Sequence, residues 1–349
     1  MTAFPSAPPM HIPADPARRP VAAWLLACCA LVFAMVVVGG VTRLTHSGLS
    51  IVEWQPFIGT IPPLTDADWA EQFEKYKLTP EFKQRNHAMT VEGFKGIFWW
   101  EYFHRLLGRV IGLAFLLPFV WFLARGRLDA PLAGRLAGLF VLGGLQGAMG
   151  WYMVKSGLVD DPRVSQFRLT AHLGLALLIH ALMLWVATGL LLGTRSAKAS
   201  RAARFALAFA GLVFAMALTG GLVAGIRAGF AYNTWPLMNG HFMPPEVWMI
   251  EPWWRNFGWN MAMVQFVHRT LALVLLAFAL ALAWRVLRDP ATPRIARIAA
   301  GTLAVVVPAQ VTLGIATLLA TVPVSLGAAH QGGAVVVLSA AVWLARALR

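Results

Sequence analysis

The amino-acid sequence predicts an all-α integral membrane protein, with eight transmembrane helices in two tandem, pseudo-two-fold-related four-helix bundles. Three observations predict this fold class: the hydropathy, the placement of the basic residues and an internal repeat. Of the 349 residues, 58% are hydrophobic and only 13% are charged, and the mean hydropathy is +0.65. A composition of this kind is typical of a chain that crosses a membrane several times.

Apolar runs locate the helices along the chain. The runs cover residues 21–42, 110–124, 136–154, 169–194, 205–226, 270–284 and 298–345. The last run is too long for one crossing of a hydrocarbon core that is about 30 Å thick. The sequence Thr321-Val-Pro-Val-Ser325 divides it into two. The expected number of membrane helices is therefore eight.

The net charge of +14 is distributed unevenly. Five segments hold 15 Lys and Arg against 3 Asp and Glu: residues 1–20, 125–135, 195–204, 285–297 and 346–349. The rest of the chain holds 14 Lys and Arg against 12 Asp and Glu. This asymmetry is the positive-inside pattern. It predicts a multi-pass membrane protein with both termini in the cytoplasm, and it explains the basic charge without a nucleic-acid partner.

An internal repeat relates the two halves of the chain. Residues 31–63 and 212–245 share LVFAM, a Gly-Gly pair, a later Gly, a Trp and a closing Pro-Pro in the same order. A repeat of this size predicts two similar units, here residues 21–194 and 205–349, joined by a cytoplasmic linker at 195–204. Since each unit has four helices, both enter the membrane with the same orientation. Residues 1–20 form a cytoplasmic tail.

Two long segments connect helices on the outer side. Residues 43–98 hold most of the acidic residues, and the polar stretch from Asp66 to Arg85 is predicted to be partly helical and amphipathic. Residues 227–260 hold six Trp or Tyr residues. These aromatic residues are typical of a membrane-interface belt, and a lid over a bound ligand is the alternative.

Four histidines occupy matching places in strongly apolar sequence. His104 and His172 in the first half match His268 and His330 in the second, and each is predicted near the outer start of a helix. Ionisable side chains inside membrane helices usually have a function. Two histidines that face each other across a four-helix bundle can ligate a haem, whereas zinc would require further ligands. The pattern predicts two metal or haem sites toward the outer face.

Other polar side chains near these histidines have two interpretations each. Arg105 and Arg269 follow His104 and His268 directly, and either extend to the lipid headgroups or pair with haem propionates. His46, which has Arg227 at its repeat position, is expected to stabilise an acidic group near the first site. The unmatched His180 is expected to be structural or to form a polar contact between helices, and Cys28 and Cys29 to be packing residues.

One difference between the halves points to chemistry. Glu101 lies three residues before His104 on the same helix face, and Gln265 takes its place before His268. A buried carboxylate beside only one of two matched sites is a candidate catalytic group that moves a proton or holds a water. The alternative is a carboxylate at the outer boundary that pairs with Arg105 or with an arginine of a loop.

The sequence resembles haem A synthase over residues 21 to 345. The motifs that carry the resemblance are GGVTRLTHSGLSIVEWQP, EYFHR, TAHLGLAL, NTWPLMNG, QFVHR and AAHQGGA. The resemblance implies an oxidoreductase that oxidises a ring methyl group of haem O to a formyl group, giving haem A for cytochrome oxidase. Residues 43–98 contain no cysteine, as in the cysteine-free subtype of alphaproteobacteria and mitochondria.

The resemblance also implies a role for each site residue. His268 and His330 would be the axial ligands of a haem b cofactor. His104 and His172 would lie around the iron of the substrate haem O, and Glu101 would be the catalytic carboxylate.

The partners of such an enzyme would be haem O, membrane lipid, haem O synthase and an electron acceptor that the sequence does not identify. Water would supply the oxygen, and the sequence leaves oligomerisation open. The alternative function is a di-haem b-type membrane electron carrier or quinol dehydrogenase, in which both haems are permanent. A transporter is disfavoured because all four histidines are expected near one face.

Overall fold

A computed structural model describes residues 15–53, 58–159, 162–193 and 200–349. Residues 1–14 of the predicted tail and 195–199 of the predicted linker lie outside these residues, as does Trp54 of the repeat. The α-helices are α1 Arg19–Leu44, α2 Asp66–Lys77, α3 Val91–Ala124, α4 Ala130–Gly157, α5 Gln166–Leu192, α6 Arg201–Gly225, α7 Asn256–Trp259, α8 Met261–Arg288, α9 Arg294–Leu319 and α10 Val324–Ala347. Short helical turns span Pro16–Arg18, Ile58–Thr60, Phe82–Asn86, Ala228–Phe230, Pro245–Trp248 and Trp253–Arg255.

Within the described residues, eight helices are long and apolar enough to cross a membrane. These are α1, α3, α4, α5, α6, α8, α9 and α10, and no β-strand accompanies them in this part of the chain. The prediction of an all-α protein with eight membrane helices is confirmed.

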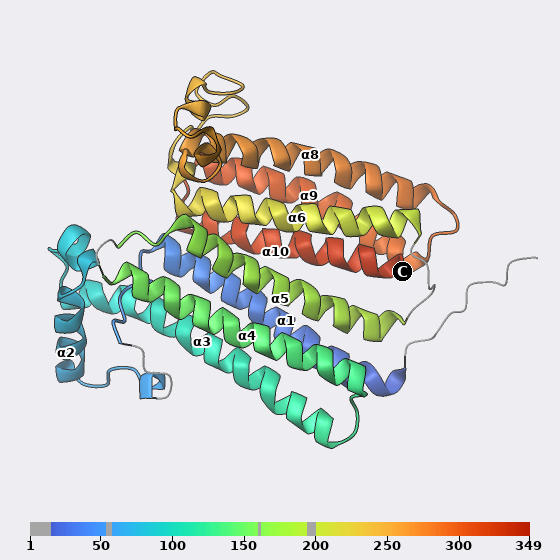
Figure 1. Cartoon of the computed structure of the whole chain (residues 1–349), viewed down its shortest axis with the longest axis horizontal. Coiled ribbons are helices and arrows are strands. Elements are labelled where there is room, and N and C mark those ends of the chain that lie inside the picture. Colours follow the sequence, from blue (N-terminus) through green and yellow to red (C-terminus); the bar gives the residue numbers. More distant parts are fainter. Residues whose placement is uncertain (1–14, 54–57, 160–161, 194–199) are drawn as a thin grey trace, which may run out of the picture.

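The membrane helices pack in two sets (Figure 1). Helices α1, α3, α4 and α5 contact one another around the first set, and α6, α8, α9 and α10 do so around the second. Helices α1 and α5 meet α6 and α10 between the sets, and a single apolar core runs through both. The relation of the two sets by a two-fold axis stays a prediction.

The break inside the last apolar run lies where the sequence placed it. Helix α9 ends at Leu319, and Thr321 and Val322 both have positive φ angles, of 61° and 55°. Left-handed backbone cannot continue an α-helix. Pro323 then precedes the first residue of α10, so the 298–345 run makes two helices.

Helix α3 begins much earlier than its apolar run suggested. The run starts at residue 110, but the helix starts at Val91, where the Thr90 side chain accepts a hydrogen bond from the Gly93 N–H. The early turns are stabilised because Phe94 and Phe98 are buried in a cluster with aromatic side chains of α2. The expectation that His104 begins its helix is therefore wrong.

Helix α2 is amphipathic, as its sequence predicted. Trp69, Phe73 and Tyr76 are buried against α3. The first turn is closed by a capping box, in which Thr65 and Asp68 exchange side-chain to backbone hydrogen bonds.

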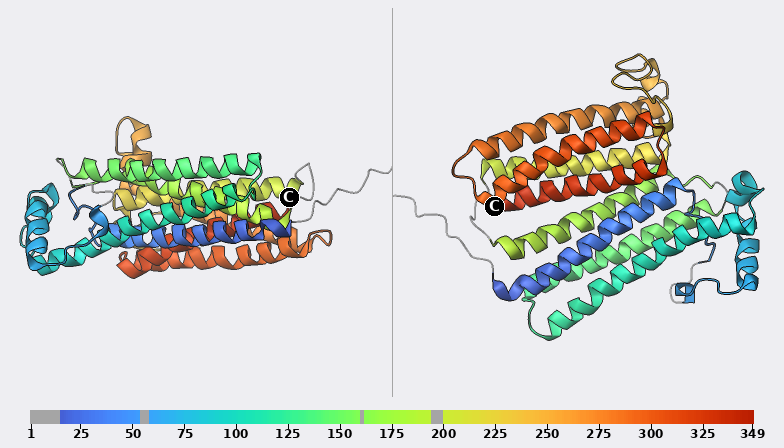
Figure 2. Two further views of the ribbon diagram at one scale, coloured as in Figure 1. Left: turned by 90° about the horizontal axis from the view of Figure 1, so that it is seen from below. Right: turned by 180° about the vertical axis from the view of Figure 1, so that it is seen from behind.

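The two long connecting segments lie at the same end of the molecule. Helix α2 and the loops between α6 and α8 lie at one end, and the start of α1 and the C-terminus lie at the other (Figures 1 and 2). Several aromatic side chains of the second segment are exposed, among them Trp253, Trp254 and Phe242. This exposure suits a membrane interface.

Two minor predictions concern buried polar groups of the helices. The His180 Nε2 atom lies 2.8 Å from the Ser339 Oγ atom, which links α5 to α10 and confirms a polar contact between helices. Cys28 and Cys29 are buried free thiols inside α1, as expected for packing residues.

Candidate functional site

The four matched histidines lie on α3, α5, α8 and α10. His172 and His330 each lie six residues after the first residue of their helix, and His268 lies seven after Met261. The rings of His268 and His330 face each other, with centroids 6.5 Å apart and planes at 78°. His104 lies within electrostatic range of His172. The structure thus brings the predicted partners together within each half.

Each histidine ring packs against a glycine of a neighbouring helix. A Cβ atom built on that glycine would come within 2.7 to 3.2 Å of the ring Cε1 atom: Gly39 for His104, Gly150 for His172, Gly220 for His268 and Gly314 for His330. Close-packed interiors leave no room for such an added atom. The glycines occupy matching places in the two halves, so the repeat extends to the surfaces on which the four rings rest.

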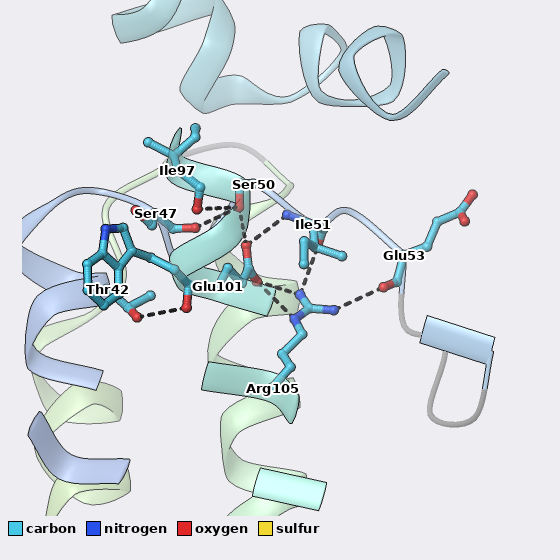
Figure 3. Close-up of polar contacts among 9 residues, drawn as sticks. Thr42, Ser47, Ser50, Ile51, Glu53, Ile97, Glu101 and Arg105 are labelled. Carbon is cyan, nitrogen blue, oxygen red and sulfur yellow. Dashed lines mark hydrogen bonds and ion pairs between the residues drawn. The ribbon is translucent and has the colours of Figure 1, made fainter. Parts of the chain in front are cut away.

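Glu101 lies at the centre of a polar network between α3 and the outer segment (Figure 3). Its Oε2 atom accepts hydrogen bonds from the Ser50 hydroxyl and the Ile51 backbone N–H, both at 2.8 Å. Its Oε1 atom accepts from the Arg105 guanidinium at 3.0 and 2.6 Å. The side chain is 2% exposed. The carboxylate therefore pairs with Arg105 and also holds the loop that follows α1.

Gln265 holds the matching loop in the second half with the opposite polarity. Its Nε2 atom donates to the backbone oxygens of Ala228, at 2.6 Å, and Ala231, at 2.9 Å. Its Oε1 atom is buried and has no hydrogen-bond partner in the described part of the chain. The first half thus has a carboxylate that accepts from its loop, and the second has an amide that donates to its loop.

Arg105 bridges α3 to the backbone of the outer segment. Its Nη2 atom donates to the Ile51 oxygen at 2.7 Å, and its Nη1 atom to the Glu53 oxygen at 3.0 Å. Together with the bonds to Glu101, these contacts occupy most of the guanidinium.

Arg269 repeats this arrangement in the second half. Its guanidinium donates to the backbone oxygens of Tyr232 and Thr234. These two residues match Ile51 and Glu53 in the repeat. Both arginines therefore fasten an outer loop to the helix that carries a site histidine, and pairing with propionates stays a prediction.

A small cavity lies beside Arg105. Its volume is ≈ 220 Å³. It is lined by Arg105 of α3, by Trp151 and Lys155 of α4, and by Val52 of the loop that follows α1. Two cationic side chains, Arg105 and Lys155, thus line one cavity between α3 and the outer end of α4. An anionic group would be stabilised there.

The donor sets fit haem in both halves. Two imidazoles that ligate one metal from opposite sides through bonds of about 2 Å have centroids roughly 6 Å apart, and the second pair has this spacing. In the first pair, the Nδ1 atoms of His104 and His172 are buried without a hydrogen-bond partner among the described residues, so no described protein group is bonded to either atom. In the described ranges, no group of three or more His, Cys, Asp or Glu side chains could hold a metal ion.

The structure adds a buried carboxylate that the sequence reasoning missed. Glu81 is 3% exposed, and its Oε2 atom has no hydrogen-bond partner in the described residues. Burial, opposed by Arg85 and aided by nearby Glu101, raises the pKa of Glu81 to about 7. Its loop position between α2 and α3 gave no signal in the sequence, because burial there depends on how α2 folds back.

Comparisons with known proteins agree with this arrangement. A family model described as cytochrome oxidase assembly protein matches residues 22–342. Proteins named "Heme A synthase" are 58% identical over 336 residues in Nitrosospira multiformis (95% of this chain, 94% of that protein) and 54% identical over 336 residues in Nitrosomonas eutropha (95% and 94%). A third, from Rhodospirillum centenum, is 50% identical over 347 residues (99% and 92%).

These matches cover nearly the whole chain at high identity, and they confirm the resemblance that the motifs carried. The chain belongs to the cytochrome oxidase assembly protein family, among relatives that are named haem A synthase.

Proposed function

We propose that this chain is a haem A synthase, an oxidoreductase that converts a ring methyl group of haem O to a formyl group. The observation that carries the proposal is the presence of two matched histidine pairs with a buried carboxylate beside only one of them. The names of the relatives support the same activity and do not favour the alternative of a di-haem electron carrier.

The first half is the substrate site in this proposal. His104 and His172 would hold the iron of haem O, and the cavity lined by Arg105 and Lys155 would receive an anionic group of the substrate. The order of the halves follows from Glu101, because the second half has an amide at this position.

The second half would hold haem b, with His268 and His330 as its ligands. Haem b supplies one-electron transfer when it is bound. Arg269 and Gln265 fasten the loop between α6 and α8 to the helix that carries His268.

The reaction requires two successive two-electron oxidations of one carbon. In the first, the methyl group loses a hydrogen and gains a hydroxyl from water, releasing two electrons and two protons. In the second, the alcohol gains another hydroxyl from water, again with two electrons and two protons. The resulting geminal diol loses water to give the aldehyde. The electrons leave to an acceptor that the sequence does not identify.

Glu101 is the group that we expect to handle the released protons or to orient the attacking water. It accepts hydrogen bonds from Ser50, Ile51 and Arg105, so its orientation is fixed. A carboxylate so held can accept a proton only when one of these bonds breaks. Movement of the Ser50–Ile51 loop is therefore expected to accompany proton transfer.

The remaining predictions fit this proposal. The membrane helices belong to a multi-pass protein. We propose that it lies in the cell inner membrane with the haem sites toward the outer face and both termini in the cytoplasm. The tail is residues 1–20, the haem O half is 21–194, the linker is 195–204, and the haem b half is 205–349. Haem O synthase is the expected donor of the substrate.

The test of the function is production of haem A in cells that make haem O but have no haem A synthase. Haems are extracted from membranes with and without this chain and are identified by mass. A haem O mass that gains one oxygen and loses two hydrogens supports the function. Two unmodified haems in the purified protein, with no conversion, would support the di-haem carrier instead.

The test of Glu101 compares two opposite exchanges. Glu101→Gln removes the carboxylate, and Gln265→Glu introduces one at the matching place. Both exchanges put the wrong polarity against an outer loop, so both report loop disruption. Only Glu101→Gln is expected to abolish haem A while haem b stays bound. Undiminished haem A in the Glu101→Gln variant would contradict the assigned role, and an equal loss in both variants would indicate a loop effect.

A further inference from the structure

One ring nitrogen of His268 has a hydroxyl partner that its counterpart lacks. The Thr219 Oγ1 atom on α6 lies 2.8 Å from the His268 Nδ1 atom. The same Oγ1 atom lies 2.7 Å from the backbone oxygen of Met216, one turn earlier. Both contacts are within ordinary hydrogen-bond range.

These two contacts determine which nitrogen of His268 carries the proton. A threonine hydroxyl has one hydrogen, and the Met216 backbone oxygen can only accept. The Thr219 hydroxyl therefore donates to Met216 and accepts from the Nδ1–H of His268. In a neutral imidazole the lone pair is then on Nε2, the nitrogen that is left to ligate an iron.

The matching place in the first half has no hydroxyl. Val38 stands where Thr219 stands, directly before the glycine on which the histidine ring rests. The His104 Nδ1 atom is buried without a partner in the described ranges. No hydrogen bond among the described residues therefore fixes the tautomer of the His104 ring.

The second histidine of each pair shows a related difference. The Gln310 Nε2 atom donates to the His330 backbone oxygen at 2.8 Å and lies 3.1 Å from its Nδ1 atom. In the first half, Gln146 lies 3.4 Å from the Nε2 atom of His172 instead. The matched glutamines thus contact opposite ring nitrogens, and the Gln310 side chain is anchored to backbone as well.

We propose that Thr219 is a positioning residue that holds the His268 ring ready as a permanent axial ligand, and that Val38 at the matching place leaves His104 a ligand from which haem is released. This inference rests on the proposed function, which assigns a resident haem to the second half and a substrate haem to the first. It explains how two histidine pairs in similar four-helix units can differ in how firmly they retain haem.

The expected effect of Thr219 on haem affinity can be judged from other histidine ligands that have lost a hydrogen-bond partner. Removing a hydrogen-bond partner of a ligating histidine usually lowers metal affinity by about 10- to 100-fold. A hydrogen bond from Nδ1–H also makes the imidazole a stronger donor to the iron, which lowers the reduction potential of the haem. Thr219 is therefore expected to influence both haem retention and potential.

The experiment exchanges the two matched residues in the full-length protein. Thr219→Val copies the first half, Thr219→Ser keeps the hydroxyl, and Val38→Thr copies the second half. Each variant is purified in detergent, haem b per polypeptide is measured over time with excess apomyoglobin as a haem acceptor, and the midpoint potential is measured by redox titration. Haem A formation is measured in the same membranes.

Thr219→Val is expected to lose haem b about 10- to 100-fold faster and to have a raised midpoint potential, while Thr219→Ser behaves as the parent. Val38→Thr is expected to slow the release of haem from the first pair. A Thr219→Val variant with unchanged retention and potential would overturn the inference, as would a Thr219→Ser variant as defective as Thr219→Val.

The same measurements separate this inference from the proposed function. A parent protein that makes haem A but retains no haem at the second pair contradicts the inference alone. A parent protein that retains haem b in the manner described, but makes no haem A when haem O is supplied, contradicts the function alone.

Discussion

Arg227 and His46 occupy matching positions in the two halves, and they contact each other. The Arg227 Nη2 atom lies 3.2 Å from the His46 Nδ1 atom, across 181 residues of chain. Both residues have positive φ angles, of 59° and 56°. Because matched residues can touch only near the place where the halves meet, this contact supports an axis between them. The side chain that contacts the His46 ring is thus a guanidinium, and the expected role of His46 in stabilising an acidic group stays a prediction.

His46 is expected to make the protein sensitive to acid. Partial burial, together with the positive charges of Arg227, Arg43 and Arg85, lowers the pKa of His46 to about 4. Because the unfolded chain binds this proton near pH 6.5, stability is expected to fall as the pH decreases from about 6.5 toward 4. More than a third of the residue is still exposed, so solvent screening should limit the loss to about 1 kcal/mol. Thermal unfolding of the parent and the His46→Gln variant at pH 5 and pH 7.5 tests this, and equal pH dependence in the two proteins would contradict it.

Glu81 is expected to have the opposite pH dependence. Its folded pKa is raised to about 7, by burial and then by Glu101, against the lowering effects of Arg85, Arg43 and Arg227. The folded state holds the proton longer than the unfolded chain, so stability is expected to fall as the pH rises from about 4.5 through 7.

The Glu81→Gln variant removes this dependence. It should be more stable than the parent at pH 8, by at most about 3 kcal/mol, and equal to it at pH 5. Thermal unfolding at both values measures the difference. If the Glu81→Gln variant gains as much stability over the parent at pH 5 as at pH 8, the charge of Glu81 is not the cause of the gain.

The sequence was informative about the fold because membrane helices follow from local composition. Hydropathy runs located all eight helices, and Pro323 marked the break before α10. The start of α3 at Val91 could not be predicted in this way. The early turns of α3 depend on packing against α2. Helix α2 is polar in composition, and its position depends on tertiary packing, which cannot be read from the local sequence.

The residues of the candidate site could be predicted where the two halves of the chain align. The alignment of the halves brought out the histidine pairs and the contrast between Glu101 and Gln265. It could not show that both side chains hold an outer loop, because the direction of the loop backbone determines whether an acceptor or a donor is required there. The exchange of Val38 for Thr219 was visible in the same alignment, but its meaning required the distance from the hydroxyl to the ring nitrogen.

The aromatic cluster between α2 and α3 is expected to hold α2 in place. Phe94 is completely buried, and its ring contacts those of Trp69, Phe73 and Tyr76. Phe94→Ala would remove a large side chain from this cluster, at a cost of about 3–5 kcal/mol. Limited proteolysis should then cut within α2 many times faster. The exposed Leu113 of the same helix offers a control, since Leu113→Ala should leave the rate unchanged; equal rates in both variants would contradict a packing role.

Gly314 is expected to be essential for the position of His330. A Cβ atom at this place would lie 2.7 Å from the ring Cε1 atom, and such an overlap forces the ring away from its partner His268. Gly314→Ala is therefore expected to lower haem b content several-fold, seen as loss of the haem absorbance per polypeptide. Gly301→Ala on the same helix provides the control, because nothing lies within 4 Å of a Cβ there. Equal haem content in both variants would show that the His330 ring on α10 can move away from residue 314 of α9 without losing its place as a ligand.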